Sequence, residues 1–422
     1  MEATRVQLAQ GVNLTYLPAR KFKTSLLSAQ FVTPLRQETA GANALLAAVL
    51  RRGTMSCPDM GALSAQMDNL YDASIDYTVR KKGENQCVGF VASFIDDRYA
   101  PGGEQLLEPV AELLGELVCD PVTYHGRFVP EYFDSEKTNL LEAIRSLIND
   151  KRDWADSRLL RALCAGEPYA VSRLGDEETV DKLQALRVYD QYRQLISTAP
   201  LEIIYSGSAE LERVRLALAA AFATLPREEV RMISSAAPHV GRETVQYVED
   251  AMDVTQGKLG MGFFCGSSDM PALLMGNTLF GGSSNSKLFL NVREKLSLCY
   301  YASSLYHRQK GLITVSSGIE FQNYQRAYDE IMAQLAAVQK GELEDWELEG
   351  ARSTLLNSYA TVGDSQGKLE NFYLGQAATG RSETPADLAQ AVMEVSAERI
   401  CRAMSTVKLD TVYFLKGKEA QA

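Results

Sequence analysis

Arg293 and Tyr300 lie seven residues apart in one segment of the chain. This segment opens with the glycine-containing loop 281–284, continues through Leu-Phe at 288–289 and includes Arg-Glu-Lys at 293–295. A guanidinium fork and a phenol can both donate hydrogen bonds to a peptide carbonyl or a developing oxyanion without being consumed. The pair is therefore suited to hold a peptide backbone. The alternative is that residues 293–295 form a solvated helix end and that Tyr300 is a strand residue with one buried face.

Residues 39–54 form an alanine-rich helical stretch that has the setting of an inverted zinc motif without its ligands. In a His-x-x-Glu-His motif the two imidazoles face one metal, and the Glu acts as general base. Counted back from Gly53 and Thr54, these three positions fall on Ala44, Ala47 and Ala48. Alanine can neither coordinate a metal nor accept a proton. The other interpretation is a core helix that uses the high helix propensity of alanine, and both interpretations exclude zinc from this helix.

Taken with these motifs, the whole chain resembles the pitrilysin or insulinase-type zinc peptidases, the inverzincins, whose relatives include the subunits of the mitochondrial processing peptidase. That family takes its third zinc ligand from a glutamate-rich helix, which residues 133–144 resemble. The resemblance places the third ligand on Ala143, with Glu136 retained before it and Glu142 beside it. All four positions of the zinc site are then alanine. The sequence leaves open whether the two glutamates do more than occupy a solvated face.

The resemblance also implies roles for the second motif and for partners. In the family, the Arg and Tyr of this segment reach the zinc site of the opposing domain or subunit and hold the substrate backbone, which makes Arg293 and Tyr300 the expected substrate-binding residues. Family members pack two similar α/β domains, and two such units close like a clamshell. We therefore expect a non-catalytic subunit without a cofactor that pairs with a zinc-bearing paralogue as a heterodimer, or with itself as a homodimer, around a peptide or unfolded polypeptide. The alternative is a scaffold protein in which Arg293 is dispensable.

Three further segments resemble one bacterial subgroup of silent paralogues within this family. They are Lys-Phe-Lys-Thr at 21–24, Asp-Asn-Leu-Tyr-Asp-Ala-Ser at 68–74 and Arg-Lys-Lys-Gly-Glu at 80–84. That subgroup is commonly named for an association with modification of elongation factor P. The resemblance implies a bacterial protein but gives no substrate.

The order of predicted elements indicates an α+β fold made of two homologous domains, each with a mainly antiparallel sheet packed by helices. We expect an N-terminal domain at 1–224, a linker at 225–242 and a C-terminal domain at 243–422, since the coarse order of elements repeats after the linker. The first two strands are expected to form a hairpin. Predicted strands are 7–17, 23–33, 75–80, 86–94, 201–206, 244–249, 258–264, 299–306, 312–319 and 411–415, and predicted helices are 40–51, 58–71, 103–117, 131–152, 177–195, 210–223, 271–280, 286–295, 325–339, 344–362 and 386–405.

Composition limits the class of protein. With 422 residues, 46% of them hydrophobic and 23% charged, the chain has the composition of a globular protein large enough for two cores. Its net charge of −11 argues against a nucleic-acid partner. The sequence shows no signal-peptide or membrane-spanning run, so we expect a cytoplasmic protein. The seven cysteines are scattered singly and the three histidines lie far apart, which excludes a locally spaced metal site.

Overall fold

The computed structural model describes residues 3–231, 233 and 236–418. These residues form two compact units, each assembled from three separate parts of the chain. Unit 1 takes residues up to 145, 171–235 and 363–382, and unit 2 takes residues 146–170, 236–362 and those from 383 on. Within the described part of the chain, no helix is both long and apolar enough to cross a membrane.

Unit 1 is built on a six-stranded sheet with the order β1-β2-β8-β3-β5-β4. Neighbouring strands are antiparallel except β2 and β8, which run parallel. All seven residues of β8 are buried, as expected for a strand between two neighbours. The strands are β1 (Thr4–Ala9), β2 (Val12–Pro18), β3 (Thr24–Pro34), β4 (Ser74–Lys82), β5 (Asn85–Ile95) and β8 (Leu201–Gly207), with a separate two-stranded ribbon of β6 (Thr123–Tyr124) and β7 (Arg127–Phe128).

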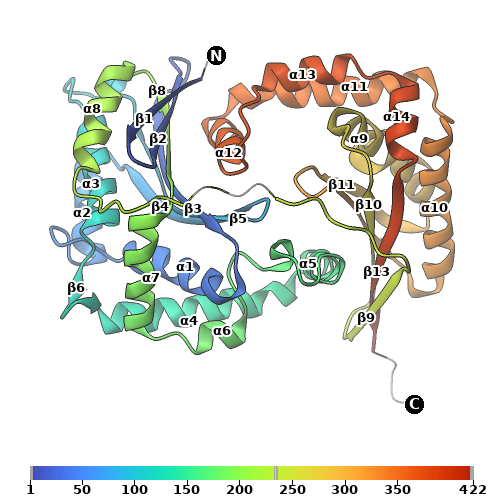
Figure 1. Cartoon of the computed structure of the whole chain (residues 1–422), viewed down its shortest axis with the longest axis horizontal. Coiled ribbons are helices and arrows are strands. Elements are labelled where there is room, and N and C mark those ends of the chain that lie inside the picture. Colours follow the sequence, from blue (N-terminus) through green and yellow to red (C-terminus); the bar gives the residue numbers. More distant parts are fainter. Residues whose placement is uncertain (1–2, 232, 234–235, 419–422) are drawn as a thin grey trace. The chain divides into compact units, whose positions relative to one another are not determined.

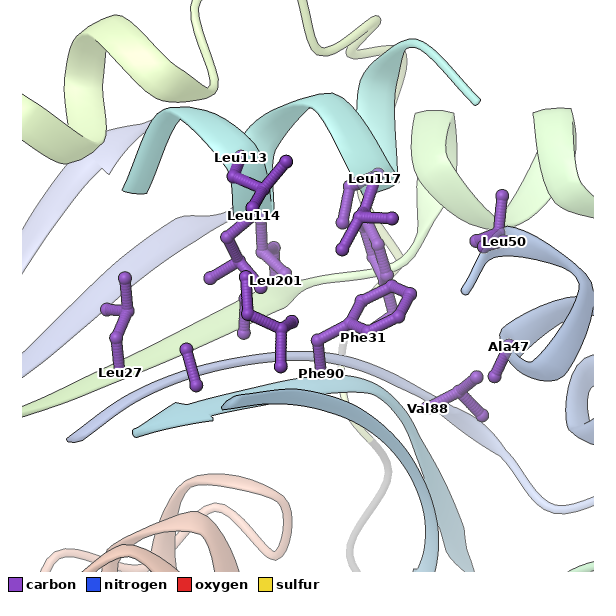
Figure 2. Packing of buried hydrophobic residues seen from close by; sticks show 14 of the residues in the cluster. Leu27, Phe31, Ala47, Leu50, Val88, Phe90, Leu113, Leu114, Leu117 and Leu201 are labelled. Carbon is purple, nitrogen blue, oxygen red and sulfur yellow. The ribbon is translucent and has the colours of Figure 1, made fainter. Parts of the chain in front are cut away.

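The core of unit 1 lies between this sheet and its helices. Figure 2 shows Leu27, Phe31, Phe90 and Leu201 of the sheet beside Leu113, Leu114 and Leu117 of α3. The helix α3 has apolar residues at helical spacing on one strongly buried face. The helices of this unit are α1 (Gln37–Leu50), α2 (Met60–Asn69), α3 (Leu107–Cys119), α4 (Pro130–Ser146), α6 (Glu177–Asp181), α7 (Ala185–Thr198), α8 (Leu211–Ala221) and α12 (Gln366–Ala377).

Unit 2 repeats the same strand arrangement. Its five-stranded sheet has the order β11-β12-β10-β13-β9, and its neighbours are antiparallel except β13 and β9, which are parallel. Position for position, this matches the order β4-β5-β3-β8-β2 in unit 1, including the place of the parallel pair. The predicted α+β fold with two similar, mainly antiparallel domains is therefore confirmed. The strands are β9 (Gln246–Met252), β10 (Gly257–Cys265), β11 (Cys299–His307), β12 (Leu312–Ile319) and β13 (Val407–Gly417).

The helices of unit 2 surround a second apolar core. Two of its segments, η4 (Thr278–Gly282) and η5 (Leu288–Lys295), are π-helical, a conformation that is rare and is often found at functional sites. The α-helices are α5 (Lys151–Leu163), α9 (Met270–Asn277), α10 (Tyr324–Lys340), α11 (Asp345–Ala360), α13 (Pro385–Met393) and α14 (Ala397–Met404).

Two helices pack in a different unit from the one that their position in the sequence suggests. Helix α5 precedes the linker but packs on β10 and β13, and α12 comes from the second half of the chain but packs on β8 and β3. In Figure 1 α5 is green beside the later-coloured strands of its unit, and α12 is orange-red. The sequence analysis predicted neither helix separately. Its domains, 1–224 and 243–422, place α5 in the N-terminal domain and α12 in the C-terminal domain, whereas α5 belongs to unit 2 and α12 to unit 1. The change of unit at residues 235–236 falls inside the predicted linker.

The predicted hairpin of residues 7–17 with residues 23–33 is wrong. Residues 7–17 contain the turn of a hairpin of their own, β1 with β2. Strand β8 lies between β2 and β3 and pairs with both, through Thr15 and Ile204 on one side and through Ser28 and Ile204 on the other. Every residue of β8 is buried, as suits a strand with neighbours on both sides, and a short-range prediction cannot anticipate that place.

Candidate functional site

Arg293 and Tyr300 line one pocket in unit 2. The pocket has a volume of about 450 Å³, and its wall consists of Arg293, Glu294, Ser297, Leu298, Cys299, Tyr300 and Glu320. The Tyr300 side chain is 61% exposed, and the Arg293 side chain is 41% exposed. The two residues singled out from the sequence therefore lie in the same hollow, and neither is buried in packing.

The π-helical segment η5 and strand β11 position this pair. Arg293 lies in the last turn of η5, and Tyr300 is the second residue of β11. The short connection between them is held by two backbone bonds, from Leu296 N to Asn291 O at 3.1 Å and from Leu298 N to Val292 O at 3.0 Å. Ser297, which lines the pocket, has a φ of 50°, in the left-handed region that few residues other than glycine adopt. Backbone strain of this kind clusters at binding sites.

The start of η5 is fixed by a buried ion pair. The Lys287 ammonium lies 2.9 Å and 3.1 Å from the two carboxylate oxygens of Glu347, and both side chains are about nine-tenths buried. Glu347 also accepts a bond from the backbone N–H of Glu344. On the preceding segment, a Cβ on Gly281 would lie 2.8 Å from the Ser304 nitrogen of β11, so only glycine allows this approach. These contacts fix the position of η5 and therefore the point at which the Arg293 side chain leaves it.

The pocket holds both charges and a phenol. The Tyr300 hydroxyl donates to Glu320 Oε1 at 2.6 Å, and this hydrogen bond to a carboxylate raises the pKa of Tyr300. The Arg293 guanidinium lies 4.7 Å from the centre of the Phe289 ring, and its Nε is 3.5 Å from Glu294 Oε1. Such a pocket can offer donors to a peptide carbonyl and, through Glu320, an acceptor to a peptide N–H or a cation.

Sequence reasoning missed Glu320 and Ser297. Glu320 directly follows β12, and the antiparallel register pairs Cys299 with Ile319, which brings Glu320 beside Tyr300. The sequence predicted both strands, at 299–306 and 312–319, but not the register between them. Without the register, the contact between Glu320 and Tyr300 cannot be predicted. Nothing in the sequence marks Ser297, because its conformation results from the turn between η5 and β11.

The alanines of the degenerate zinc motif lie in unit 1. Ala44, Ala47 and Ala48 are all buried in α1, whose residues 40–50 have no exposed face. Figure 2 shows Ala47, the residue predicted to replace the general base, pointing toward Val88 of β5. Ala143 is exposed on α4. Methyl groups alone occupy these positions, so they offer no ligand atom.

The retained Glu136 serves an ion pair. It is 8% exposed and accepts a hydrogen bond from Arg52 Nη1 at 2.9 Å. Asn139 donates to its second oxygen at 3.1 Å. Glu136 thus joins α4 to the residues that follow α1, while Glu142 lies on the exposed face of α4.

Within the described residues, one group of three side chains could hold a metal ion, and it is not on α1. It consists of Cys164, Glu167 and His239 in unit 2. The fully buried ammonium of Lys310 lies 2.5 Å from Glu167 Oε2. A divalent ion there would have to share this carboxylate with a cation already bound to it, so we assign the group to an internal ion-pair network.

Comparison with known proteins agrees with this geometry. Residues 182–355 match the family model described as the peptidase M16 inactive domain. The chain is 34% identical to the probable inactive metalloprotease YmfF of Bacillus subtilis over 97% of this chain and 96% of that protein. It belongs to the M16 peptidase family. The resemblance to pitrilysin and insulinase-type enzymes is thereby confirmed, and the family model and the relative both support a non-catalytic M16 member.

Solved structures show the same M16 fold. A conserved protein from Enterococcus faecalis V583 is 27% identical and superposes with a TM-score of 0.89, with all of both chains covered. A peptidase M16 inactive domain protein from Pseudomonas fluorescens, at 17% identity, has a TM-score of 0.80, again with full coverage of both chains. The two-unit architecture is therefore shared with relatives that have little sequence in common with this chain.

Proposed function

We propose that this chain is a non-catalytic M16 subunit that binds a peptide or unfolded polypeptide through Arg293 and Tyr300 and supplies it to a zinc-bearing M16 paralogue. The pairing is a heterodimer in this proposal, and a homodimer is the form expected without that paralogue. The relation to mitochondrial processing peptidase subunits, the bacterial subgroup named above, the clamshell arrangement and a cytoplasmic location belong to the same proposal.

One observation carries the proposal. Arg293 and Tyr300 lie together on the wall of a pocket of about 450 Å³, with exposed donor groups, although the chain has no catalytic residues for them to serve. The surrounding structure is specific: a buried ion pair fixes the start of η5, and Ser297 in the turn after η5 has a left-handed backbone conformation. A geometry held in this way suits recognition of a ligand by hydrogen bonds.

The competing proposal is a scaffold without a peptide ligand. It would be favoured if Arg293 and Tyr300 were taken up by packing. Instead, Arg293 contacts the adjacent Glu294 and the Phe289 ring, and Tyr300 donates to Glu320. Glu294 and Glu320 both line the pocket. Donors in such contacts can change partner when a ligand carbonyl arrives, because their present bonds are partly solvated.

The test uses peptide hydrolysis by the zinc-bearing paralogue, alone and mixed with this chain. Wild type is compared with Arg293→Ala and Tyr300→Phe, and Arg326→Ala is the control because Arg326 is exposed on α10 of the same unit, outside the pocket. We expect activity in the mixture that falls at least tenfold with Arg293→Ala while the complex still forms. Activity that requires the chain but ignores both pocket variants would support the scaffold. Hydrolysis with bound zinc in the chain alone would overturn the non-catalytic assignment.

A further inference from the structure

A small polar pocket lies in unit 1, between the start of α1 and the end of α7. Its volume is about 210 Å³. The end of β3, the start of α1, the C-terminal half of α7 and the segment around residue 231 form its wall, and all four belong to unit 1. In Figure 1 the blue helix α1 lies beside the green helix α7, on which it packs. The described residues of the wall include two arginines, three threonines and two glutamines, but no acidic residue.

Backbone hydrogen bonds fix the positions from which the two arginines, Arg36 and Arg231, extend. Next to Arg36, the N–H of Leu35 donates to the carbonyl oxygen of Glu84 at 2.8 Å. The N–H of Arg231 donates to the carbonyl oxygen of Thr198 at 2.9 Å, which holds this segment on the end of α7. Both backbone positions are therefore set before a ligand arrives, which lowers the ordering cost of binding.

The carbonyl groups at the end of α7 do not require the guanidinium of Arg231. The last carbonyls of a helix have no partner within the helix and carry partial negative charge. Here Arg227 supplies the donors, through Nη1 to Ile196 O at 2.7 Å and through Nη2 to Ala199 O at 2.9 Å. Backbone N–H groups within residues 228–231 donate to the two carbonyls in between. The helix end is thus neutralised by Arg227, and the Arg231 side chain stays available.

Arg36 and Arg231 carry charges that the protein does not neutralise. Both side chains are exposed, and within the described part of the chain neither guanidinium forms an ion pair or a hydrogen bond. Arg213 of the same unit, by contrast, lies 2.6 Å from a carboxylate oxygen of Glu108. Glu38, the acidic residue nearest to Arg36 in the sequence, is exposed and does not form part of the wall. Two uncompensated positive charges in one pocket attract an anion, although the chain has a net charge of −11.

We propose that this pocket binds a small phosphate monoester between Arg36 and Arg231. The guanidinium fork matches the oxygens of a phosphate, and the hydroxyl and amide groups of the wall can donate to the remaining oxygens. Pockets for drug-sized ligands have volumes of about 300 to 1,000 Å³, so this one suits a phosphate on a short carbon chain. A bound phosphate would also hold the segment 227–231 to the start of α1.

This site is separate from the proposed peptide site. It lies in unit 1, shares no residue with the Arg293 pocket and requires no partner subunit. Its failure and that of the proposed function are therefore distinct results.

The test is isothermal titration calorimetry of the full chain with glycerol 3-phosphate, with glycerol as the uncharged control. We expect one saturable site per chain and no binding of glycerol. The double variant Arg36→Gln with Arg231→Gln should weaken binding at least tenfold, because it removes both charge-assisted donors. The matched control, Arg187→Gln with Arg193→Gln, removes two exposed arginines of α7 outside the wall and should leave the affinity unchanged. Thermal melts of each variant establish that unit 1 remains folded.

Hydrogen exchange gives a second measurement in the same samples. At a glycerol 3-phosphate concentration of about ten times Kd, exchange of the amides in residues 227–231 should slow by up to about tenfold. The effect should disappear in the pocket variant and persist in the control variant.

Four results would overturn the proposal. They are the absence of saturable binding, an equal loss of affinity in the pocket and control variants, unchanged exchange in residues 227–231, and tighter binding of succinate than of glycerol 3-phosphate. The last would assign the pocket to dicarboxylates.

Discussion

The ion pair between Arg80 and Glu370 is expected to hold α12 in unit 1. Glu370 lies on α12, its side chain is 4% exposed, and it accepts two bonds of 2.6 Å from Arg80 and one of 2.7 Å from Ser28. Breaking a buried pair by removing one partner costs about 3 to 5 kcal/mol. Arg80 remains 23% exposed and can be partly rehydrated, and glutamine keeps one oxygen as acceptor. We therefore expect Glu370→Gln to destabilise unit 1 by about 2 to 3 kcal/mol.

The assay is urea unfolding followed by circular dichroism, with hydrogen exchange of residues 366–377 to localise the effect. Both tryptophans, Trp154 and Trp346, belong to unit 2, so their fluorescence reports on that unit separately. For a unit of roughly 200 residues, the expected loss corresponds to a fall in Tm of about 5 to 10 °C. The double variant Arg80→Met with Glu370→Leu should recover most of it, since an apolar pair leaves no uncompensated charge.

The matched control is Glu178→Gln, which removes an exposed carboxylate paired with Lys182 and should have no measurable effect. Stability unchanged by Glu370→Gln, or lost equally in both variants, would refute the reasoning. So would unaltered exchange in residues 366–377, because the loss would then arise elsewhere than at α12.

Three further outcomes are expected. Ala47→Glu places a carboxylate in the core of unit 1 and should destabilise the unit by about 3 kcal/mol or more in a thermal melt, without bound zinc in metal analysis. Tyr300→Phe removes the exposed bond to Glu320 and should leave the Tm unchanged while peptide binding falls, and a large loss of Tm would contradict a binding role. Burial works to raise the pKa of Asp410, but hydrogen bonds from Arg242, Thr411 and His239 together outweigh burial, so the pKa lies below its usual value. Unit 2 should therefore lose stability as the pH falls from about 4, and Asp410→Asn should flatten that dependence in urea titrations.

The candidate pocket was predictable in part. The resemblance to the family's Arg and Tyr segment selected Arg293 and Tyr300, and in the structure both line one pocket. The partner Glu320 depended on the register of two strands, and the orientation of Arg293 depends on the buried Lys287–Glu347 pair, whose members lie 60 residues apart. Local patterns specify which element a residue belongs to, but not which distant charge it meets.

The fold shows the same division. Apolar alternation predicted most strands, including the buried β8, and helical periodicity predicted most helices. The predicted hairpin failed because β8 entered between its strands. The helices α5 and α12 were not predicted. Helix α5 comes from the first half of the sequence but packs in unit 2, and α12 comes from the second half but packs in unit 1.

The sequence by itself determined that residues 44, 47, 48 and 143 cannot bind a metal ion, because side-chain chemistry is a property of each residue and alanine offers no ligand atom. It also determined most of the strands and helices, since their hydrophobic periods are local. Only the tertiary structure decided that α5 and α12 exchange units, and that Arg36 and Arg231 line one pocket. Such contacts join residues up to about 290 positions apart, as in Arg80 and Glu370, and depend on the burial of whole faces, which no short stretch of sequence encodes.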